Sequence, residues 1–459
     1  MSIVGPTGPI GPQGEKGKSG RNGLEGPTGA SGSGGQFVVL DNPSQIINNS
    51  YNISPTGNSS NTYLKNCLIT SGINKDFCPL GSGLNNSCYA IAISGTDIYV
   101  SGNFTTAGGV SANNIAKYNT LTNTWSPLGS GLNSTCRAIA ILGTDIYVGG
   151  DFSTAGGVSA IRIAKYNTIT NIWSPLGSGL DGSTFLTCNA IAISGTDIYV
   201  GGSFPNAGGV VVNNIAKYDG TSWFALGSGL SGSTSPTCNA IAISGTDIYV
   251  GGSFPTAGSV LVNNIAKYDG TNWFALGSGL GGSTSPACTA IAISGTDIYV
   301  GGSFPTAGSV LVNNIAKYDG TSWSGLSFGF NTGLNSTCRA IGILGTNIYV
   351  GGDFNFASGI SVNRIAVYNG STWFALGTGL NSSCYAIEIS GTDIYACGFF
   401  TTANEVNVNR ITKYSFDYIN LNYNSQKIST LYNSLSGSQV NSYNGSTYIG
   451  VINNISFYT

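Results

Sequence analysis

The stretch that decides the fold runs from Cys188 to Leu230 and reads CNAIAISGTDIYVGGSFPNAGGVVVNNIAKYDGTSWFALGSGL, because close copies of it recur through most of the chain. The cysteine that opens it returns at steps of 48, 52, 50, 50, 50 and 46 residues, as Cys88, Cys136, Cys188, Cys238, Cys288, Cys338 and Cys384. A fixed period in this range is typical of a repeat architecture, in which each unit packs against the next.

Each repeat contains four strand signals. AIAIS and DIYVGG are rich in β-branched and aromatic residues, and NNIAKY and SWFALG follow them. Turn residues separate the four segments, and no window shows helical spacing. A unit of four short antiparallel strands is too small to bury its own face, so the pattern predicts the blade of a β-propeller.

The ends of the array predict how the propeller closes. A tryptophan marks the fourth strand of six units, at Trp125, Trp173, Trp223, Trp273, Trp323 and Trp373, whereas the seventh unit stops after its third strand, near Tyr414. At the front, Phe77 to Leu84 parallels the segment that begins at Trp125. We therefore predict an all-β, seven-bladed propeller of four-stranded blades over 77–414, closed by the strand at 77–81 so that no sheet edge is left open.

Residues 1–35 carry glycine at every third position from Gly5 to Gly35. Only glycine fits at the axis of a collagen triple helix, so this register predicts a stalk on the order of 90 Å long. A flexible glycine-rich linker is the alternative, but linkers do not hold a three-residue register. Because a triple helix needs three chains, the predicted partner is the protein itself, as a homotrimer.

Two further segments flank the repeats. Residues 36–76 are expected to form a connector, rich in Asn and Ser, with short strands, and residues 415–459 a C-terminal extension. In the extension, Tyr443-Asn444-Gly445-Ser446 predicts a β-hairpin, because Asn-Gly favours a two-residue turn. Both segments are natural places for contacts between the chains of a trimer.

The amino-acid composition limits the kinds of partner that the chain can bind. Charged residues make up only 8% of the chain and its formal net charge is −2, so no field steers it to nucleic acid or to an anionic membrane. No apolar stretch reaches membrane-spanning length, and Met1 to Val4 is too short for a signal peptide. We expect synthesis in a host cytoplasm and neither membrane insertion nor nucleic-acid binding.

The chain has ten cysteines and no histidine. Zinc sites and general-base catalysis usually need histidine, so we expect no metal, no cofactor and no enzymatic activity. The seven repeated cysteines occupy one equivalent place per blade, which predicts small buried residues rather than disulfides.

The strongest enzymatic alternative is a sialidase-like glycosidase. Tyr218 to Trp223, YDGTSW, resembles the Asp-box turn of sialidase propellers but is one residue short between Asp and Gly. Three arginines share one repeat position, Arg162, Arg364 and Arg410, but the first lies in the second repeat and the others in the sixth and seventh. An ordinary hairpin turn is the simpler interpretation of Asp219-Gly220.

An aspartate recurs in the Gly-Thr-Asp-Ile-Tyr segment, at Asp97, Asp145, Asp197, Asp247, Asp297 and Asp393, with Asn347 in the remaining copy. Six copies indicate a scaffold role, since a catalytic carboxylate would be singular. The exchange for asparagine favours hydrogen bonds to nearby backbone amides over an ionised role.

The GPTGPIGPQ start resembles the collagen-like proteins of giant DNA viruses, of bacterial spore surfaces and of phage tail fibres, and the repeats resemble kelch-like propeller repeats. These resemblances imply a non-enzymatic structural or adhesive protein of a giant-virus virion surface, for fibre assembly or host attachment. The alternatives are the sialidase-like enzyme and an intracellular kelch-like interaction scaffold, although the latter gives the stalk no role.

The junctions between repeats vary in length. From the aromatic residue to the next cysteine, three junctions take 11 residues and four consecutive ones take 15. The longer junctions predict a raised arc on one face, built from 181–187, 231–237, 281–287 and 327–333, that recognises a host-surface glycan or another virion protein. The alternative is neutral drift in surface loops. The candidate recognition residues are Asp181, Phe185, Ser231, Thr234, Gly281, Thr284, Phe328 and Phe330.

Overall fold

The structure, a computed structural model of the chain, describes residues 77–182, 186–232, 235–282, 285–326 and 333–415, and the backbone of three strands between 441 and 458. The predicted stalk and connector, residues 1–76, lie outside the described residues. The described residues form strands and turns and contain no helix.

Each repeat forms a four-stranded antiparallel sheet, and the described residues form seven of them, sheets 1 to 7 in the order of their first strands. The first strands are β2 (Cys88–Ser94), β8 (Cys136–Leu142), β15 (Thr187–Ser194), β22 (Thr237–Ser244), β29 (Ala287–Ser294), β35 (Cys338–Leu344) and β41 (Cys384–Ser390). The second strands are β3 (Asp97–Gly102), β9 (Asp145–Gly150), β16 (Asp197–Ser203), β23 (Asp247–Ser253), β30 (Asp297–Ser303), β36 (Asn347–Gly352) and β42 (Asp393–Gly398).

The third strands are β6 (Ile115–Asn119), β12 (Ile163–Asn167), β19 (Ile215–Tyr218), β26 (Ile265–Tyr268), β33 (Ile315–Tyr318), β39 (Ile365–Tyr368) and β45 (Ile411–Ser415). The fourth strands are β7 (Thr124–Pro127), β13 (Ile172–Pro175), β20 (Trp223–Ala225), β27 (Trp273–Ala275), β34 (Trp323–Ser324), β40 (Trp373–Ala375) and, in sheet 7, β1 (Phe77–Pro79).

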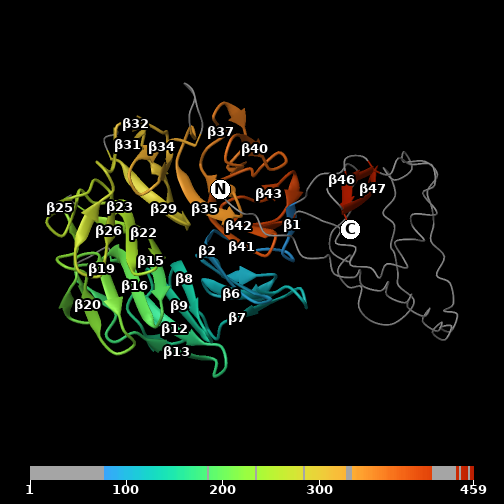
Figure 1. Cartoon of the computed structure of the whole chain (residues 1–459). Coiled ribbons are helices and arrows are strands. Elements are labelled where there is room, and N and C mark those ends of the chain that lie inside the picture. The colour runs from blue at the N-terminus through green and yellow to red at the C-terminus, as the bar shows by residue number, and fades with distance from the viewer. Residues whose placement is uncertain are drawn as a thin grey trace, which may run out of the picture. The chain divides into compact units, whose positions relative to one another are not determined.

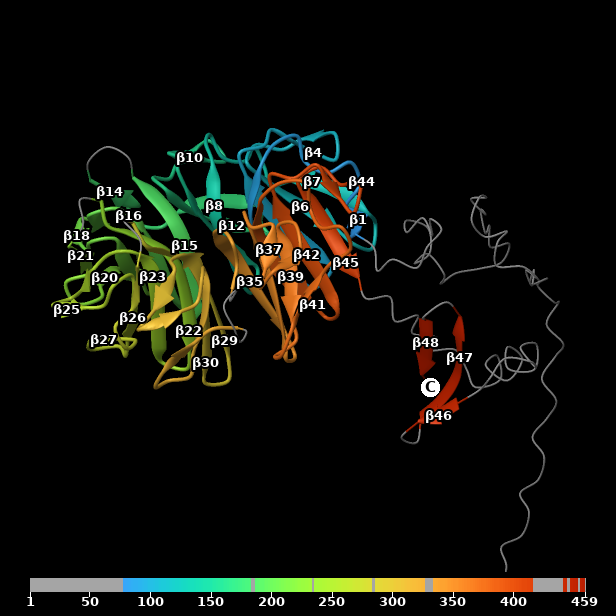
Figure 2. The same ribbon diagram turned by 90° about the horizontal axis from the view of Figure 1, so that it is seen from above.

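The sheets stand side by side around one axis, with their first strands innermost (Figure 1). Each first strand contacts the first strands of the two neighbouring sheets, and β2 of sheet 1 contacts β41 of sheet 7. Figure 2 shows β15, β22 and β29 in this arrangement from a second direction. The described repeats therefore form a β-propeller, the fold class that the sequence predicts.

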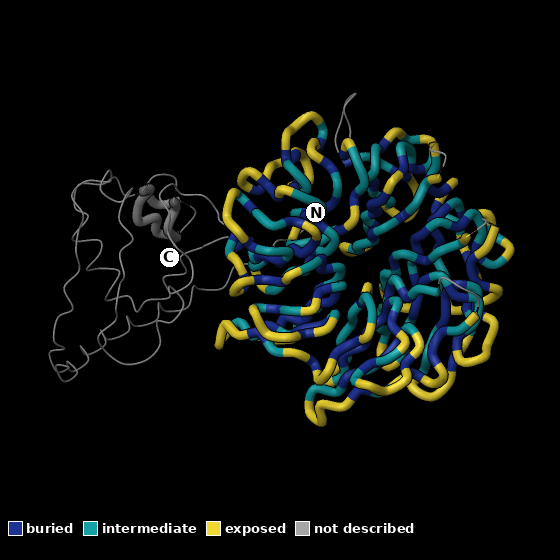
Figure 3. Tube along the Cα trace, turned by 180° about the vertical axis from the view of Figure 1, so that it is seen from behind, coloured by how far each residue is buried: buried dark blue, intermediate teal, exposed yellow. Residues whose placement is uncertain are grey.

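The core lies between neighbouring sheets, and exposed residues gather in the turns (Figure 3). Glycines on the second strands allow a close approach there. A Cβ atom added to Gly149 of sheet 2 would lie 2.2 Å from Sγ of Cys188 in sheet 3. Equivalent contacts join Gly201 with Cys238, Gly251 with Cys288, Gly301 with Cys338, and Gly351 with Cys384.

Tryptophans of the fourth strands tie each sheet to the one before it. Trp125 packs against Tyr118 of its own sheet, with ring centroids 5.0 Å apart. Its Nε1 donates a hydrogen bond to the carbonyl oxygen of Leu80, which precedes the first strand of sheet 1. The same bond recurs from Trp173, Trp223, Trp273, Trp323 and Trp373 to the equivalent leucine one repeat earlier.

Sheet 7 combines the two ends of the array. β1 pairs with β45, with Phe77 opposite Tyr414 and Pro79 opposite Thr412, which is the pairing that the sequence predicts. Phe77 is only 2% exposed, and its ring lies 4.9 Å from that of Tyr414, in the way that tryptophan and tyrosine pair in the other sheets.

Sheet 7 has Phe77 where the other six sheets have tryptophan, and Asn404 lies at the position that faces the indole in those sheets. Its position is glycine in five of the other sheets, and a Cβ atom on Gly108 of sheet 1 would lie 2.2 Å from Cδ1 of Trp125. Phe77 has no five-membered ring there, so a side chain as large as that of asparagine fits, whereas sheet 6, which has Trp373, carries the smaller Ser358. Asn404 Oδ1 accepts a hydrogen bond from the backbone N–H of Thr378 at 3.0 Å.

Small sheets cover the connection between second and third strands. Four are two-stranded: β4 (Thr106–Ala107) with β5 (Val110–Ser111), β10 (Thr154–Ala155) with β11 (Val158–Ser159), β37 (Phe356–Ala357) with β38 (Ile360–Ser361), and β43 (Thr402–Ala403) with β44 (Val406–Asn407). Three gain a strand from the preceding junction: β14 (Leu180–Asp181), β17 (Asn206–Ala207) and β18 (Val210–Val211); β21 (Leu230–Ser231), β24 (Thr256–Ala257) and β25 (Val260–Leu261); β28 (Leu280–Gly281), β31 (Thr306–Ala307) and β32 (Val310–Leu311).

The C-terminal extension contains one separate sheet of β46 (Asn441–Tyr443), β47 (Ser446–Ile452) and β48 (Ile455–Tyr458). β46 pairs with β47 with Tyr443 opposite Ser446, at the predicted hairpin, and β48 adds a strand that the sequence analysis missed.

We predict that Phe77→Ala lowers the free energy of unfolding by about 3–5 kcal/mol, because it leaves a cavity where the two ends of the array meet. Urea unfolding followed by tryptophan fluorescence measures the loss. Leu121→Ala is the control, since Leu121 is 59% exposed and should change stability by roughly 0.5 kcal/mol or less. Equal stability of the two variants would show that β1 does not hold the propeller closed.

Candidate recognition surface

The recurring aspartates form ion pairs, so the predicted backbone-capping role is wrong. Asp97 Oδ2 lies 3.0 Å from Nζ of Lys117 on the third strand, and both side chains are partly exposed. Five other sheets repeat this pair: Asp145 with Lys165, Asp197 with Lys217, Asp247 with Lys267, Asp297 with Lys317, and Asp393 with Lys413. In sheet 6, Asn347 replaces the aspartate and Val367 replaces the lysine, so both charges are absent together.

These pairs belong to the scaffold, as the repetition predicts. Exposed pairs of this kind contribute roughly 0.5 kcal/mol each. They lie at the start of the second strand, and the junctions between repeats lie at the opposite end of the strands.

The seven repeated cysteines are buried between sheets with free thiols. Burial raises the pKa of the Cys136 thiol to about 12 and also raises the pKa of Cys188 and Cys384. The thiolate is the reactive form of cysteine, so the thiols of Cys136, Cys188 and Cys384 are poor nucleophiles at neutral pH. Within the described residues, no group of three or more His, Cys, Asp or Glu side chains is placed to hold a metal ion.

The Asp-box-like turn is a hairpin turn whose aspartate bonds its own loop. Asp219 Oδ1 accepts hydrogen bonds from the backbone N–H groups of Thr221 and Ser222, both at 2.8 Å. These bonds lower the pKa of Asp219. The three arginines at the shared position each bond a backbone carbonyl oxygen of their own sheet, Arg162 that of Asp151, Arg364 that of Asp353, and Arg410 that of Phe399.

The junctions between repeats follow two designs. In the first, an asparagine caps the next sheet: Asn133 Oδ1 accepts hydrogen bonds from the backbone N–H groups of Ser153 at 2.9 Å and Thr154 at 3.0 Å. Asn85, Asn335 and Asn381 do the same in sheets 1, 6 and 7.

In the second design, the junction adds a strand instead of a cap. Leu230 and Ser231 pair with Ala257 and Thr256. The residue that would donate to the asparagine is Pro255, which has no N–H. Gly232 follows the strand at φ 91°, and a Cβ atom there would lie 2.7 Å from the ring of Pro255. Gly182 with Pro205 and Gly282 with Pro305 repeat the arrangement.

The fourth long junction has the first design, so only three of the four long junctions are equivalent. Leu334 bridges Ala357, as Leu132 bridges Ala155 in a short junction, and Asn335 provides the cap. The additional residues of this junction therefore precede Gly333 instead of following the leucine.

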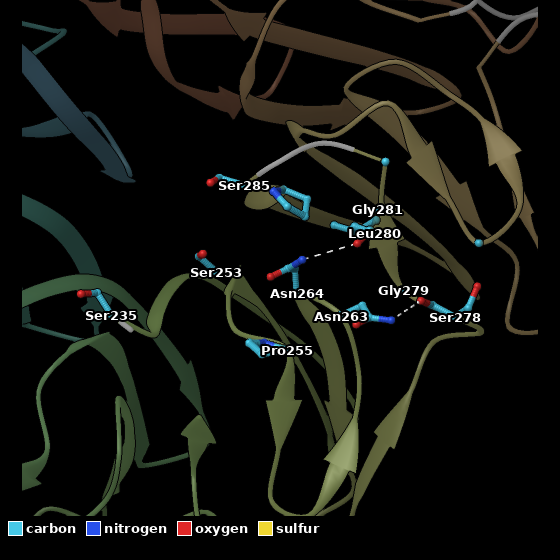
Figure 4. A pocket seen from close by; sticks show the side chains of 13 residues that line it. Ser235, Ser253, Pro255, Asn263, Asn264, Ser278, Gly279, Leu280, Gly281 and Ser285 are labelled. Carbon is cyan, nitrogen blue, oxygen red and sulfur yellow. Dashed lines mark hydrogen bonds between the residues drawn. The ribbon is translucent and has the colours of Figure 1, made fainter. Parts of the chain in front are cut away.

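A depression of about 600 Å³ lies between two of the strand-adding junctions (Figure 4). Ser235 of one junction and Ser285 of the next line it, with Ser253 and Asn264. Asn264 Nδ2 donates a hydrogen bond to the carbonyl oxygen of Leu280 at 3.4 Å, which fixes the side chain in the wall. The lining has no charged side chain and combines serine and asparagine groups with Pro255, Leu280 and Pro286, which suits hydrogen bonding to a neutral hydroxylated or amide-bearing ligand.

The structure describes three of the eight candidate recognition residues. Asp181 is partly buried in β14, and no described residue bonds its buried Oδ1. Ser231 is exposed and its Oγ lies 2.8 Å from Oγ1 of Thr256, while Gly281 lines the depression. Phe185, Thr234, Thr284, Phe328 and Phe330 lie outside the described residues.

Comparison with known proteins supports the fold. Residues 97–120 and 145–168 match a family model described as a domain of unknown function (DUF5122) beta-propeller. No curated protein matches the sequence. The part of the chain that the structure describes contains no helix long and apolar enough to cross a membrane.

Solved structures of low sequence identity resemble the chain. The computationally designed Ika8 protein is 14% identical, with a TM-score of 0.45, over 73% of this chain and 98% of its own. The extracellular domain of a hybrid two-component system from B. thetaiotaomicron is 12% identical, with a TM-score of 0.48, over 74% of this chain and 39% of its own. The RRP9 WD40 repeats are 11% identical, with a TM-score of 0.46, over 74% and 96%.

Glu388 is a singular carboxyl group on the first strand of sheet 7. Its position is alanine in sheets 1 to 5 and Gly342 in sheet 6. Burial raises the pKa of Glu388 from 4.5 to about 7. The folded state therefore binds this proton more tightly than the unfolded state does, and the stability present below pH 4.5 is lost as the pH rises through 7.

We predict that Glu388→Ala, which restores the residue of five other sheets, gains stability relative to the natural protein by about 2 kcal/mol more at pH 8 than at pH 4.5. Urea unfolding at the two pH values measures this difference. Glu388→Gln should show the same pH dependence, because it removes the ionisable group but keeps the side chain length. A stability difference that does not change with pH in either variant would contradict the buried ionisation.

Proposed function

We propose that this chain is a non-enzymatic structural and adhesive protein of a virion surface, in which a collagen stalk at 1–35 joins three chains and each presents a seven-bladed propeller head at 77–414. The observation that carries the proposal is that the sheets of the repeats are nearly constant whereas the junctions between them vary. The ionisable groups that recur in the sheets are paired within the scaffold, whereas the junction face varies in length, charge and aromatic content. Variable loops on a rigid scaffold are typical of binding proteins.

The contacts between first strands support the seven-bladed count. The series of neighbouring strands runs from β2 through β8, β15, β22, β29 and β35 to β41 and returns to β2. The seven four-stranded sheets would then be the blades of a single ring, with β1 as the strand that joins its two ends.

The strand-adding junctions present three like surfaces side by side, which fits a recognition role. Each of the three replaces an asparagine cap and carries a glycine that packs against a proline of the next sheet. The depression beside Ser235 and Ser285 would take a neutral sugar unit or a polar segment of another virion protein.

The two rival functions have weaker support. A sialidase-like enzyme needs a free carboxylate and an arginine cluster, but Asp219 bonds its own turn and Arg162 bonds a carbonyl oxygen of its own sheet. An intracellular kelch-like scaffold would explain the propeller, but it gives the glycine register of residues 1–35 no role.

We predict a trimer of the full chain and a monomer of the chain that lacks residues 1–35, because a collagen helix has no stable one-chain form. Light scattering coupled to size-exclusion chromatography gives both masses. A monomeric full chain would refute the stalk. A trimer that survives the truncation would place the trimer contacts in another segment.

We predict that shortening the three strand-adding junctions to the Leu132-Asn133-Ser134-Thr135 form, with Pro205, Pro255 and Pro305 changed to Thr, preserves folding and abolishes attachment to host cells. The proline changes restore the N–H groups that the new asparagine caps need. Flow cytometry with labelled protein measures attachment. The matched control carries the three proline changes alone and keeps the junctions at their natural length. Full attachment by the first variant would exclude these junctions from recognition.

A further inference from the structure

The first strands share a β-bulge one residue after the cysteine. The antiparallel register shifts between Cys88 and Ala90, so that Tyr89 is the additional residue, and every other first strand shifts at the same place. A bulge turns its side chain out of the ladder and often aims it at a ligand. The seven bulge residues, called the inner ring below, are Tyr89, Arg137, Asn189, Asn239, Thr289, Arg339 and Tyr385.

The inner ring residues contact one another across sheet boundaries. In sheets 3 to 5 the contacts are neutral: Asn189 Nδ2 donates to Asn239 Oδ1 at 3.4 Å, and Thr289 Oγ1 donates to the carbonyl oxygen of Cys338. These three sheets are also the ones whose junctions add a strand.

In sheets 6, 7, 1 and 2 the inner ring forms a column of two arginines and two tyrosines. Tyr89 and Tyr385 stack with ring centroids 5.4 Å apart and an interplanar angle of 24°. The guanidinium carbon of Arg137 lies 5.8 Å from the centroid of Tyr89, and that of Arg339 lies 5.3 Å from the centroid of Tyr385. Because the ring faces cover one another, the column presents phenol and guanidinium edges rather than a flat aromatic platform.

Each arginine of the column pairs with an aspartate of its own sheet, and only these two sheets have aspartate at that position. Arg137 Nε and Nη2 donate to the carboxylate of Asp151 at 2.9 and 2.8 Å, and Arg339 pairs in the same way with Asp353. The other five sheets have Asn103, Ser203, Ser253, Ser303 and Phe399 at the aspartate position. The two arginine side chains are about 40% exposed and the aspartates fix their orientation, while Nη1 takes no part in these bonds and can donate to a ligand.

Three further arginines lie beside the column. Arg162 and Arg364 bond the backbone carbonyl oxygens of Asp151 and Asp353, and Arg410 stacks on the exposed ring of Phe399 at 4.6 Å. On sheets 6, 7, 1 and 2, these five arginines face three carboxylates on the junction side, Asp151, Asp353 and Glu405. This surplus of two positive charges contrasts with the net charge of −2 for the chain.

A depression of about 340 Å³ adjoins this charge. Asn355, Arg364, Asn381 and Glu405 line it, between sheets 6 and 7. Its volume lies at the lower end of the range for ligand sites, which suits one sugar ring, and its lining offers amide, guanidinium and carboxylate groups to hydroxyl and acidic substituents.

We propose that the arginine-rich half of the inner ring, on sheets 6, 7, 1 and 2, binds an acidic carbohydrate through its carboxylate or sulfate groups. Guanidinium groups match the geometry of both anions, and exposed Phe399 offers an apolar surface to the sugar. The proposal deepens the adhesive function and rests on it, but it places recognition on the side of the inner ring away from the strand-adding junctions.

The test measures binding of the full chain to immobilised heparin, polysialic acid and neutral dextran by biolayer interferometry. We expect binding to at least one acidic probe, no binding to dextran, and weaker binding as NaCl rises from about 50 to 500 mM. Tighter binding of heparin would indicate a sulfated ligand, and tighter binding of polysialic acid would indicate a carboxylated one. Equal binding to acidic probes and dextran, or equally tight binding of single-stranded RNA, would overturn the proposal.

The double variant Arg137→Gln with Arg339→Gln should weaken binding to the acidic probe roughly tenfold or more, because it removes two charged hydrogen-bond donors. Lys217→Gln with Lys267→Gln removes the same charge from the opposite end of the strands and should bind normally. Equal losses in the two double variants would refute the site. If the arginine variant does not fold, competition of free sulfate or sialic acid with the natural protein decides, and no competition by either refutes the proposal.

The outcomes also separate this inference from the adhesive function. Unchanged binding of acidic probes by the arginine variant, with attachment lost on junction shortening, would refute the inner ring site and support the proposed function. Absence of binding to every probe and of attachment to host cells would refute both.

Discussion

The structure depends on how closely neighbouring sheets approach at their inner edges. The Cβ position of Gly149 lies 2.2 Å from Sγ of Cys188, so a side chain on the second strand would collide with the next sheet. A cysteine is small enough for this space and apolar enough to be buried there. In sheets 1 and 7, which hold the two ends of the array, Ser101 and Cys397 replace the glycine, and both are small and fully buried. The repeat therefore tolerates only small side chains where the sheets converge, and this constraint fixes the spacing of everything farther out.

Away from the inner edge, the repeats change in pairs. Asn347 and Val367 lose an ion pair together, so neither leaves an unpaired charge behind. Phe77 lacks the indole of the tryptophans, and Asn404 uses the space and bonds Thr378. A proline packed against each strand-adding junction lacks the N–H group that an asparagine cap would bind, and the asparagine itself is replaced in the same repeat. Each pair joins residues from different segments of the chain, so a change at one residue goes with a change at the residue that it contacts.

Sequence alone was sufficient for the repeat, the strands and the closing segment, because these depend on periodicity and on one aromatic residue at Phe77. Sequence alone did not predict which side chains on different strands contact one another. The role of Asp97 was misjudged because its partner, Lys117, lies on another strand, although the joint loss of both charges in the sixth repeat was a readable signal. Counting junction residues gave the correct lengths but not the place of the insertion. The Gly333-Leu334-Asn335 segment, which repeats Gly131-Leu132-Asn133, identifies that place.

The bulge explains why function can diverge within so regular a scaffold. Each inner ring residue is the extra residue of its strand, so it has no ladder partner to match, and its replacement leaves the strand register intact. Duplication of the repeat therefore supplies seven positions around the axis at which side chains can change at low cost to the fold. Sheets 3 to 5 have kept small neutral residues there, whereas sheets 6, 7, 1 and 2 carry arginine and tyrosine together with new aspartate partners for the arginines. The aspartates hold the exposed guanidinium groups in one orientation, and this fixed orientation is the feature that the proposed anion site uses.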